Sequence, residues 1–162
     1  MSAAGTLRPP GRTVGERDEV AAVRWNTHRK LVKRVQATVR DLRIPPLDPT
    51  DPLGDLVAVL EERLGYSITV VTTENDSIIN GALESRPGGG TAIIVPAGTR
   101  TPNRRRHLVC RGLARCLYRE PGHRNGRIDY STTTEQEIEY TALFLGRHVD
   151  DAQQGRIRSS AV

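Results

Sequence analysis

RRRHLVCRGLARCL, the stretch from residue 104 to residue 117, says more about the fold than any other part of the chain. Its apolar residues recur at the spacing of one helical face, which predicts a helix from Pro102 to Tyr118. Arg111 and Arg115 lie four residues apart, so they share a face of that helix. The apolar residues expected inside are Leu108, Val109, Leu113, Ala114 and Leu117.

Three short strands are expected ahead of this helix. The run from Tyr66 to Thr72 is rich in β-branched residues, and a weaker strand is expected from Asn80 to Glu84. A third strand, Thr91–Pro96, is almost wholly apolar and is therefore predicted to be buried. The three glycines at residues 88–90 predict a hairpin turn between the last two strands.

Two helices are expected before the strands. Apolar residues at helical spacing predict the first over residues 15–42, and the prolines at 45 and 46 end it. The second is expected to begin with Asp51 as its cap and Pro52 in its first turn. Gly65 is expected to end that helix.

The last helix is predicted near the C-terminus. Thr134 and Glu137 have the spacing of a capping box, and the apolar stripe that follows ends at Val149. The whole pattern predicts an α+β fold in which helices pack on a small, mostly antiparallel three-stranded sheet. One domain of residues 15–149 is expected, between a disordered tail of residues 1–14 and a polar tail of residues 150–162.

Composition narrows the class of protein. The chain has 162 residues, a formal net charge of +5 and only 4% aromatic residues, so its core must consist mainly of aliphatic side chains. Cys110 and Cys116 are too far apart along one helix for a disulfide, which predicts two reduced thiols packed in the core. The sequence has neither a signal-peptide pattern nor a stretch long enough to span a membrane, so a soluble, cytoplasmic protein is expected.

The order of the elements resembles that of the ImmA/IrrE family of zinc metallopeptidases over residues 28–149. In that family a helix bears the motif H-E-x-x-H, and a glutamate of the next helix completes the zinc site. The segment from Arg106 to Leu117 is similar to the metal helix, and TEQEIEYTA at residues 134–142 is similar to the helix that follows. The resemblance implies a zincin-like pair of helices packed with the sheet.

The same resemblance implies that the zinc site has been lost. The two metal histidines fall on Arg111 and Arg115, and the catalytic glutamate falls on Gly112. The third ligand falls on Glu137, with Glu135 as the alternative. A guanidinium group remains protonated and offers only donors, so it cannot bind Zn²⁺, and glycine has no group to accept a proton from bound water. We therefore expect neither a metal nor any other cofactor.

The sequence allows three interpretations of Arg111 and Arg115. The first is a solvated basic face on a surface helix. The second is a set of ion pairs with Glu137 and Glu135, which would replace the metal as the link between the two helices. The third is a gained site for an anion or a phosphate group.

Other residues carry weaker signals. His107, Cys110, Cys116 and His123 are candidates for a new metal site, but the two cysteines point to different sides of their helix. Trp25 is expected to be a packing anchor. The helix before residue 42 carries a basic face that suits either solvent or nucleic acid. The residues of that face are Arg29, Lys30, Lys33, Arg34 and Arg40.

The function that we predict is that of an inactive pseudo-metallopeptidase, a regulatory module that binds a protein such as a helix-turn-helix repressor. The resemblance implies a peptide groove along the edge strand, with Thr91, Ile93 and Val95 as binding residues. The basic loop carrying Arg124 and Arg127 is expected to act as a flap over an acidic segment of the partner. The alternatives are a metallopeptidase with a shifted zinc site and a basic regulator associated with nucleic acid.

Overall fold

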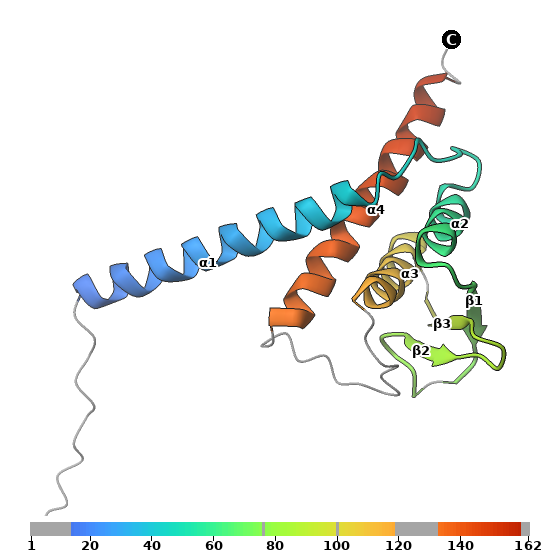
Figure 1. Cartoon of the computed structure of the whole chain (residues 1–162), viewed down its shortest axis with the longest axis horizontal. Helices are drawn as coiled ribbons and strands as arrows, with labels where there is room; N and C mark the ends of the chain where they lie inside the picture. The colour runs from blue at the N-terminus through green and yellow to red at the C-terminus, as the bar shows by residue number, and fades with distance from the viewer. Residues whose placement is uncertain (1–13, 76, 100, 119–132, 160–162) are drawn as a thin grey trace, which may run out of the picture.

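The computed structural model describes residues 14–75, 77–99, 101–118 and 133–159 (Figure 1). Within these residues the chain forms four helices and a three-stranded mixed sheet. This arrangement confirms the predicted α+β class. The predicted N-terminal tail lies outside the described residues, apart from Val14, which begins the first helix.

Helices α1 (Val14–Asp41) and α2 (Pro52–Leu64) form where the sequence predicts them. The Asp51 side chain accepts a hydrogen bond from the Gly54 amide at 3.1 Å, which satisfies one of the amides that a helix start leaves unpaired. Gly65 ends α2 in the left-handed conformation with φ 75°, which glycine adopts without steric penalty. These local signals are sufficient to predict both ends of α2.

The sheet differs from the prediction in the direction and order of its strands. Its strands are β1 (Ile68–Thr73), β2 (Ala82–Ser85) and β3 (Thr91–Pro96), in the order β1-β3-β2. β2 and β3 form the expected antiparallel hairpin, with positive φ at Gly88 and Gly89 in its turn. β1, however, pairs with β3 in parallel over six residues, so the sheet is mixed and not mostly antiparallel.

β3 is the central strand of this sheet and not an edge. It is buried over residues 92–95, and it pairs with β1 on one side and β2 on the other. The physical reason lies in its composition, because an apolar run left at an edge would expose both its side chains and its unpaired amides. The central position buries both.

The last two helices are α3 (Pro102–Leu117) and α4 (Thr133–Ser159). α4 already includes Thr133, so Thr134 lies inside the helix and is not its cap. The helix also continues for ten residues beyond Val149, through most of the predicted polar tail. No proline follows Val149, and Ala152 still packs against the core, so the helix has no reason to stop there.

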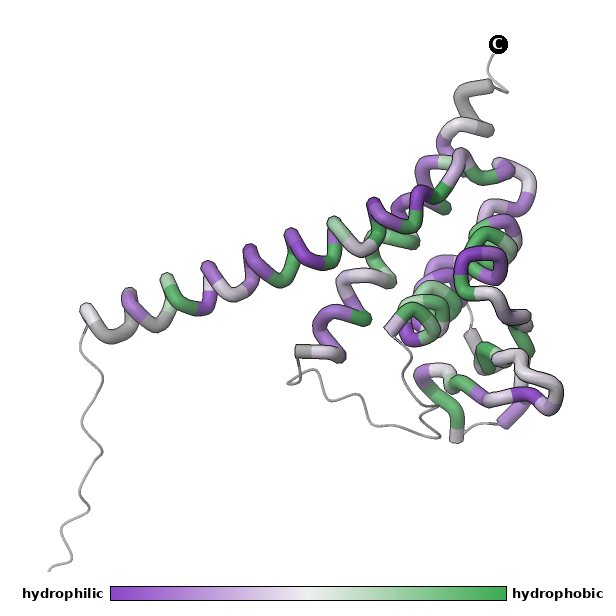
Figure 2. The backbone as a smooth tube through the Cα atoms, in the orientation of Figure 1, coloured by the Kyte–Doolittle hydropathy of each residue, from purple (hydrophilic) through white to green (hydrophobic). Residues whose placement is uncertain are grey.

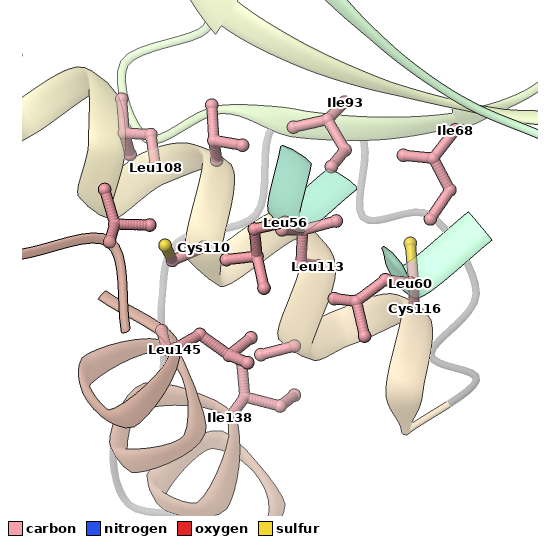
Figure 3. Close-up of a cluster of buried hydrophobic side chains, with 14 of the residues drawn as sticks. Leu56, Leu60, Ile68, Ile93, Leu108, Cys110, Leu113, Cys116, Ile138 and Leu145 are labelled. Carbon is pink, nitrogen blue, oxygen red and sulfur yellow. The ribbon is translucent and has the colours of Figure 1, made fainter. Parts of the chain in front are cut away.

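α3 lies at the centre of the molecule, between the sheet and α4 (Figure 3). Ile93 reaches it from the sheet, whereas Ile138 and Leu145 reach it from α4 (Figure 3). α2 covers a third side through Leu56 and Leu60. Cys110 and Cys116 are free thiols buried in the same core, as the sequence predicts.

Candidate functional site

A cluster of ion pairs joins α3 to α4 at the positions that the sequence singles out. Arg115 donates two parallel hydrogen bonds to Glu135, from Nη1 to Oε1 at 3.0 Å and from Nη2 to Oε2 at 3.0 Å. Arg111 lies one helical turn earlier, with Nη2 3.8 Å from Oε2 of Glu135 and Nε 3.3 Å from Oε2 of Glu139. Both arginines therefore face the two carboxylates of α4.

The cluster is buried, so these contacts are not those of a solvated surface. The side chains of Arg111, Glu135 and Arg115 retain only 6%, 11% and 13% of their exposure to solvent. An isolated charge at such a depth is strongly unfavourable, and it persists only where opposite charges and hydrogen bonds compensate it. The interpretation of Arg111 and Arg115 as a solvated basic face is therefore wrong.

The cluster contains Glu135 but not Glu137. The resemblance to zinc metallopeptidases gives Glu137 as the first expectation for the third zinc ligand, with Glu135 as the alternative. Glu137 forms an ion pair with Arg34 of α1 instead. Glu135 and Glu139 are four residues apart and share one face of α4, whereas Glu137 points about 200° away from Glu135 around the helix. Which of the two faces meets α3 depends on how the helices pack, and the sequence leaves both choices open.

His107 extends the cluster toward its exposed end. Its Nε2 lies 2.9 Å from Oε1 of Glu139, and its side chain is 36% exposed. The hydrogen bond from His107 lowers the pKa of Glu139 below its ordinary value of 4.5. Burial opposes this shift, whereas the nearby positive charges of His107, Arg111 and Arg115 add to it. Glu139 is therefore held as a carboxylate between a histidine and two arginines.

This lowered pKa predicts how stability depends on acidity. A group whose pKa is lower in the folded chain contributes stability above its ordinary pKa of 4.5, and this contribution disappears as the pH falls through its folded value. The Glu139→Gln variant should therefore be less stable than the parent at pH 7 and should lose less stability on acidification. Urea unfolding at pH 7 and pH 4 measures both quantities. Parallel losses in the two proteins would show that Glu139 does not contribute to the acid response.

Gly112, which aligns with the family's catalytic glutamate, faces the sheet and not the ion pairs. A Cβ atom at this position would lie 2.6 Å from Cγ2 and 2.9 Å from Cδ1 of Ile93. Ile93 is only 1% exposed, so it has no open space into which to move. Glycine is therefore required for the close approach of α3 to β3, and a glutamate here would need a different packing of the sheet.

Alanine at position 112 should destabilise the protein by about 1–3 kcal/mol, because overpacking against Ile93 exceeds the gain in helix propensity. Gly146 of α4 provides the matched control, since nothing lies within 4 Å of a Cβ at that position. The Gly146→Ala variant should be as stable as the parent or up to about 1 kcal/mol more stable. Equal effects of the two substitutions in urea unfolding would contradict the packing role of Gly112.

Cys110 and Cys116 are both buried in the core. Burial raises the pKa of Cys110 to about 12 and also raises the pKa of Cys116. Neutral, buried thiols are poor nucleophiles and poor metal ligands. Within the described parts of the chain, no three histidine, cysteine, aspartate or glutamate residues form a group that could hold a metal ion. His123, the fourth candidate of that set, lies outside the described residues.

The predicted peptide-binding residues are not placed as expected. Thr91, Ile93 and Val95 belong to the central strand, which pairs with β1 over residues 91–96 and with β2 over residues 91–94, so a further strand cannot add along residues 91–94. The expectation of an edge strand at these residues is wrong, because their apolar character favours the centre of the sheet. Arg124 and Arg127, the predicted flap residues, lie outside the described residues.

Trp25 is not the packing anchor that the sequence suggests, because 62% of its surface is exposed. It belongs to α1, whose start extends away from the rest of the molecule (Figure 1). The neighbouring His28 contacts Tyr140 of α4, with ring centroids 5.3 Å apart in an edge-on arrangement. The two residues are 112 positions apart in the sequence, which leaves no sequence signal for this contact.

None of the helices that the structure describes has the length and apolar character needed to cross a membrane. Comparison of the chain with protein-family models, with curated proteins and with solved structures found no match. The resemblance to zinc metallopeptidases therefore remains a prediction that depends on the residues quoted above.

Proposed function

We propose that this chain is a pseudoenzyme of the zinc metallopeptidase type, which regulates a partner protein by binding it without cleaving it. The observation that supports this proposal is the convergence of Arg111 and Arg115 on Glu135. In the proposed relatives, a metal ion occupies the space between two such helices. Here guanidinium groups take that place, and they provide hydrogen-bond donors where zinc requires lone pairs.

The chemistry of the cluster supports binding more than catalysis. A metallopeptidase needs a polarised water and a general base beside it. Arg111 and Arg115 can do neither, and Gly112 has no side chain. Glu135 and Glu139 form hydrogen bonds or ion pairs with these arginines and with His107, and these contacts join α4 to α3.

The surface that we assign to the partner is the outer edge of β2 and not β3. β2 is paired with β3 on one side, and the described residues place no strand on its other side. An extended segment of a partner could add there by backbone hydrogen bonds, as in other proteins that bind peptides at a sheet edge. A helix-turn-helix regulator is the partner class that the family resemblance suggests.

A photo-crosslinking experiment tests both parts of the proposal. A photoreactive amino acid replaces Glu84, which is exposed on β2, or Glu62, which is exposed on α2 and serves as the control. We expect a full-length partner protein to be captured from Glu84 and not from Glu62. A partner captured in cleaved form, with cleavage prevented by a chelator, would overturn the pseudoenzyme assignment. Equal capture from both positions would overturn the assignment of the β2 edge.

A further inference from the structure

Residues 23–34 of α1 form a basic arm that is separate from the ion-pair cluster. Every residue from 21 to 30 is exposed, and the start of α1 extends away from α4 (Figure 1). The sequence contains no aspartate or glutamate from residue 20 to residue 40. Its cations in this stretch are Arg24, Arg29, Lys30, Lys33, Arg34 and Arg40. Among the described residues, only Arg34 of these six forms an ion pair, with Glu137.

A groove runs along one flank of this arm, where α1 meets the start of α4. Its volume is about 590 Å³, and Val23 and Leu31 provide its apolar surface. Arg24, Lys30 and Arg34 line the same groove. The hydropathy colouring shows the same alternation of apolar and polar residues along the extended helix (Figure 2). The groove therefore combines apolar surface with several positive charges.

Aromatic rings lie among these cations. Trp25 is exposed, and its ring centroid lies 6.4 Å from that of His28, which in turn lies 5.3 Å from that of Tyr140. The row thus begins on α1 and ends on α4. Cations alone suit any acidic partner, but exposed rings between cations suit bases in particular, since every base offers a flat face for stacking.

We propose that the arm formed by residues 23–34 of α1, together with Tyr140 of α4, binds a single-stranded nucleic acid. The phosphate groups contact the cations of α1, including Arg29 and Lys33, which lie four residues apart on one face. Unpaired bases stack on the exposed ring of Trp25, which lies on the same face of α1 as Arg29 and Lys33. A duplex keeps its bases stacked inside, so it would use the cations but not the ring of Trp25. This binding is independent of the proposed pseudoenzyme function.

The chain contains one tryptophan, so its fluorescence reports directly on this surface. Titration of the full chain with a 15-nucleotide oligothymidylate should quench the emission of Trp25. About four phosphate contacts would give a salt slope of about −2.8, which corresponds to about a 50-fold loss of affinity between 50 mM and 200 mM salt. Polyglutamate of similar length and a 15-base-pair duplex are the comparison ligands.

Charge reversal locates the site. Arg29→Glu with Lys33→Glu should weaken binding of a labelled oligothymidylate at least tenfold in fluorescence anisotropy. The matched control, Arg63→Glu with Arg86→Glu, makes the same change of charge at exposed residues of α2 and of the β2–β3 turn, and should change affinity less than twofold.

Trp25→Ala should weaken binding of the oligothymidylate about tenfold, while Trp25→Phe should retain most of the affinity. Circular dichroism checks that each variant keeps its helices.

Four outcomes would overturn the proposal. These are no quenching at 50 mM salt, an equal effect of the two charge reversals, tighter binding of the duplex, and binding of polyglutamate as tight as that of the oligonucleotide. The last outcome would identify the arm as a site for an acidic protein. Quenching of Trp25 with selective loss in the Arg29→Glu, Lys33→Glu variant would support it.

Discussion

Replacing Arg111 and Arg115 by histidine is expected to convert the ion-pair cluster into a zinc site. The two new imidazoles would lie one helical turn apart on the face of α3 that meets Glu135, and the removal of Arg115 takes away two of the hydrogen bonds to that carboxylate. Two histidines and a carboxylate form a common ligand set for Zn²⁺. The double variant should bind about one zinc per chain, whereas the parent chain should bind none.

The glutamates of α4 provide a sharp control for this experiment. Glu135→Gln in the histidine variant should abolish zinc binding, but Glu137→Gln should not, because Glu137 pairs with Arg34 on another face of α4. Elemental analysis and calorimetric titration with zinc measure the binding. Zinc at 100 times its dissociation constant should also stabilise the variant by about 2.7 kcal/mol.

The result for Glu137 distinguishes the observed packing from the first sequence-based alignment. Loss of zinc on the Glu137→Gln change and retention on the Glu135→Gln change would show that α4 is rotated relative to the structure. Stoichiometric zinc in the parent chain would contradict the view that arginines have replaced the ligands. Peptidase activity is not expected even in the zinc-loaded variant, because Gly112 has no side chain that could act as the general base.

Removing Glu135 alone is expected to be the most destabilising single change in the cluster. Among the described residues, the Glu135→Leu variant would leave Glu139 as the remaining carboxylate beside the buried Arg111 and Arg115, and breaking a buried ion pair in this way typically costs about 3–5 kcal/mol. For a chain of this size, that loss corresponds to a melting temperature lower by about 6–20 °C. Urea unfolding at pH 7 gives the free energy, and differential scanning calorimetry gives the melting temperature.

A compensating second change should recover much of this loss. Arg115→Met in the Glu135→Leu background removes the unpaired charge and leaves Arg111 with Glu139 at 3.3 Å. The coupling between positions 115 and 135 should therefore exceed about 1 kcal/mol in a double-mutant cycle. Glu137→Leu is the matched control, and it should have a smaller effect because Arg34 is largely exposed. Additive effects of Arg115→Met and Glu135→Leu would show that the two side chains do not stabilise each other.

The sequence alone determines those elements whose ends or turns depend on a few neighbouring residues. Asp51, Pro52 and Gly65 define α2 because capping and the left-handed conformation depend on a few neighbouring residues. The glycines of the β2–β3 turn likewise determine a hairpin, since positive φ is accessible there. The burial of Cys110 and Cys116 follows from the apolar pattern of α3.

Only the tertiary structure decides the arrangement of elements that are distant in sequence. The parallel pairing of β1 with β3 depends on the path of the chain between them, which no residue pattern specifies. The same holds for the meeting of His28 with Tyr140, and for the exposure of Trp25.

The ion-pair cluster depends on both kinds of information. The spacing of Arg111 and Arg115 is enough to place both on one face of α3, because a helix repeats every 3.6 residues. The choice between Glu135 and Glu137 requires the rotation of α4 about its own axis. That rotation is set by Ile138, Ala142, Leu145 and Val149, whose burial against the core turns Glu135 toward the arginines and Glu137 toward α1.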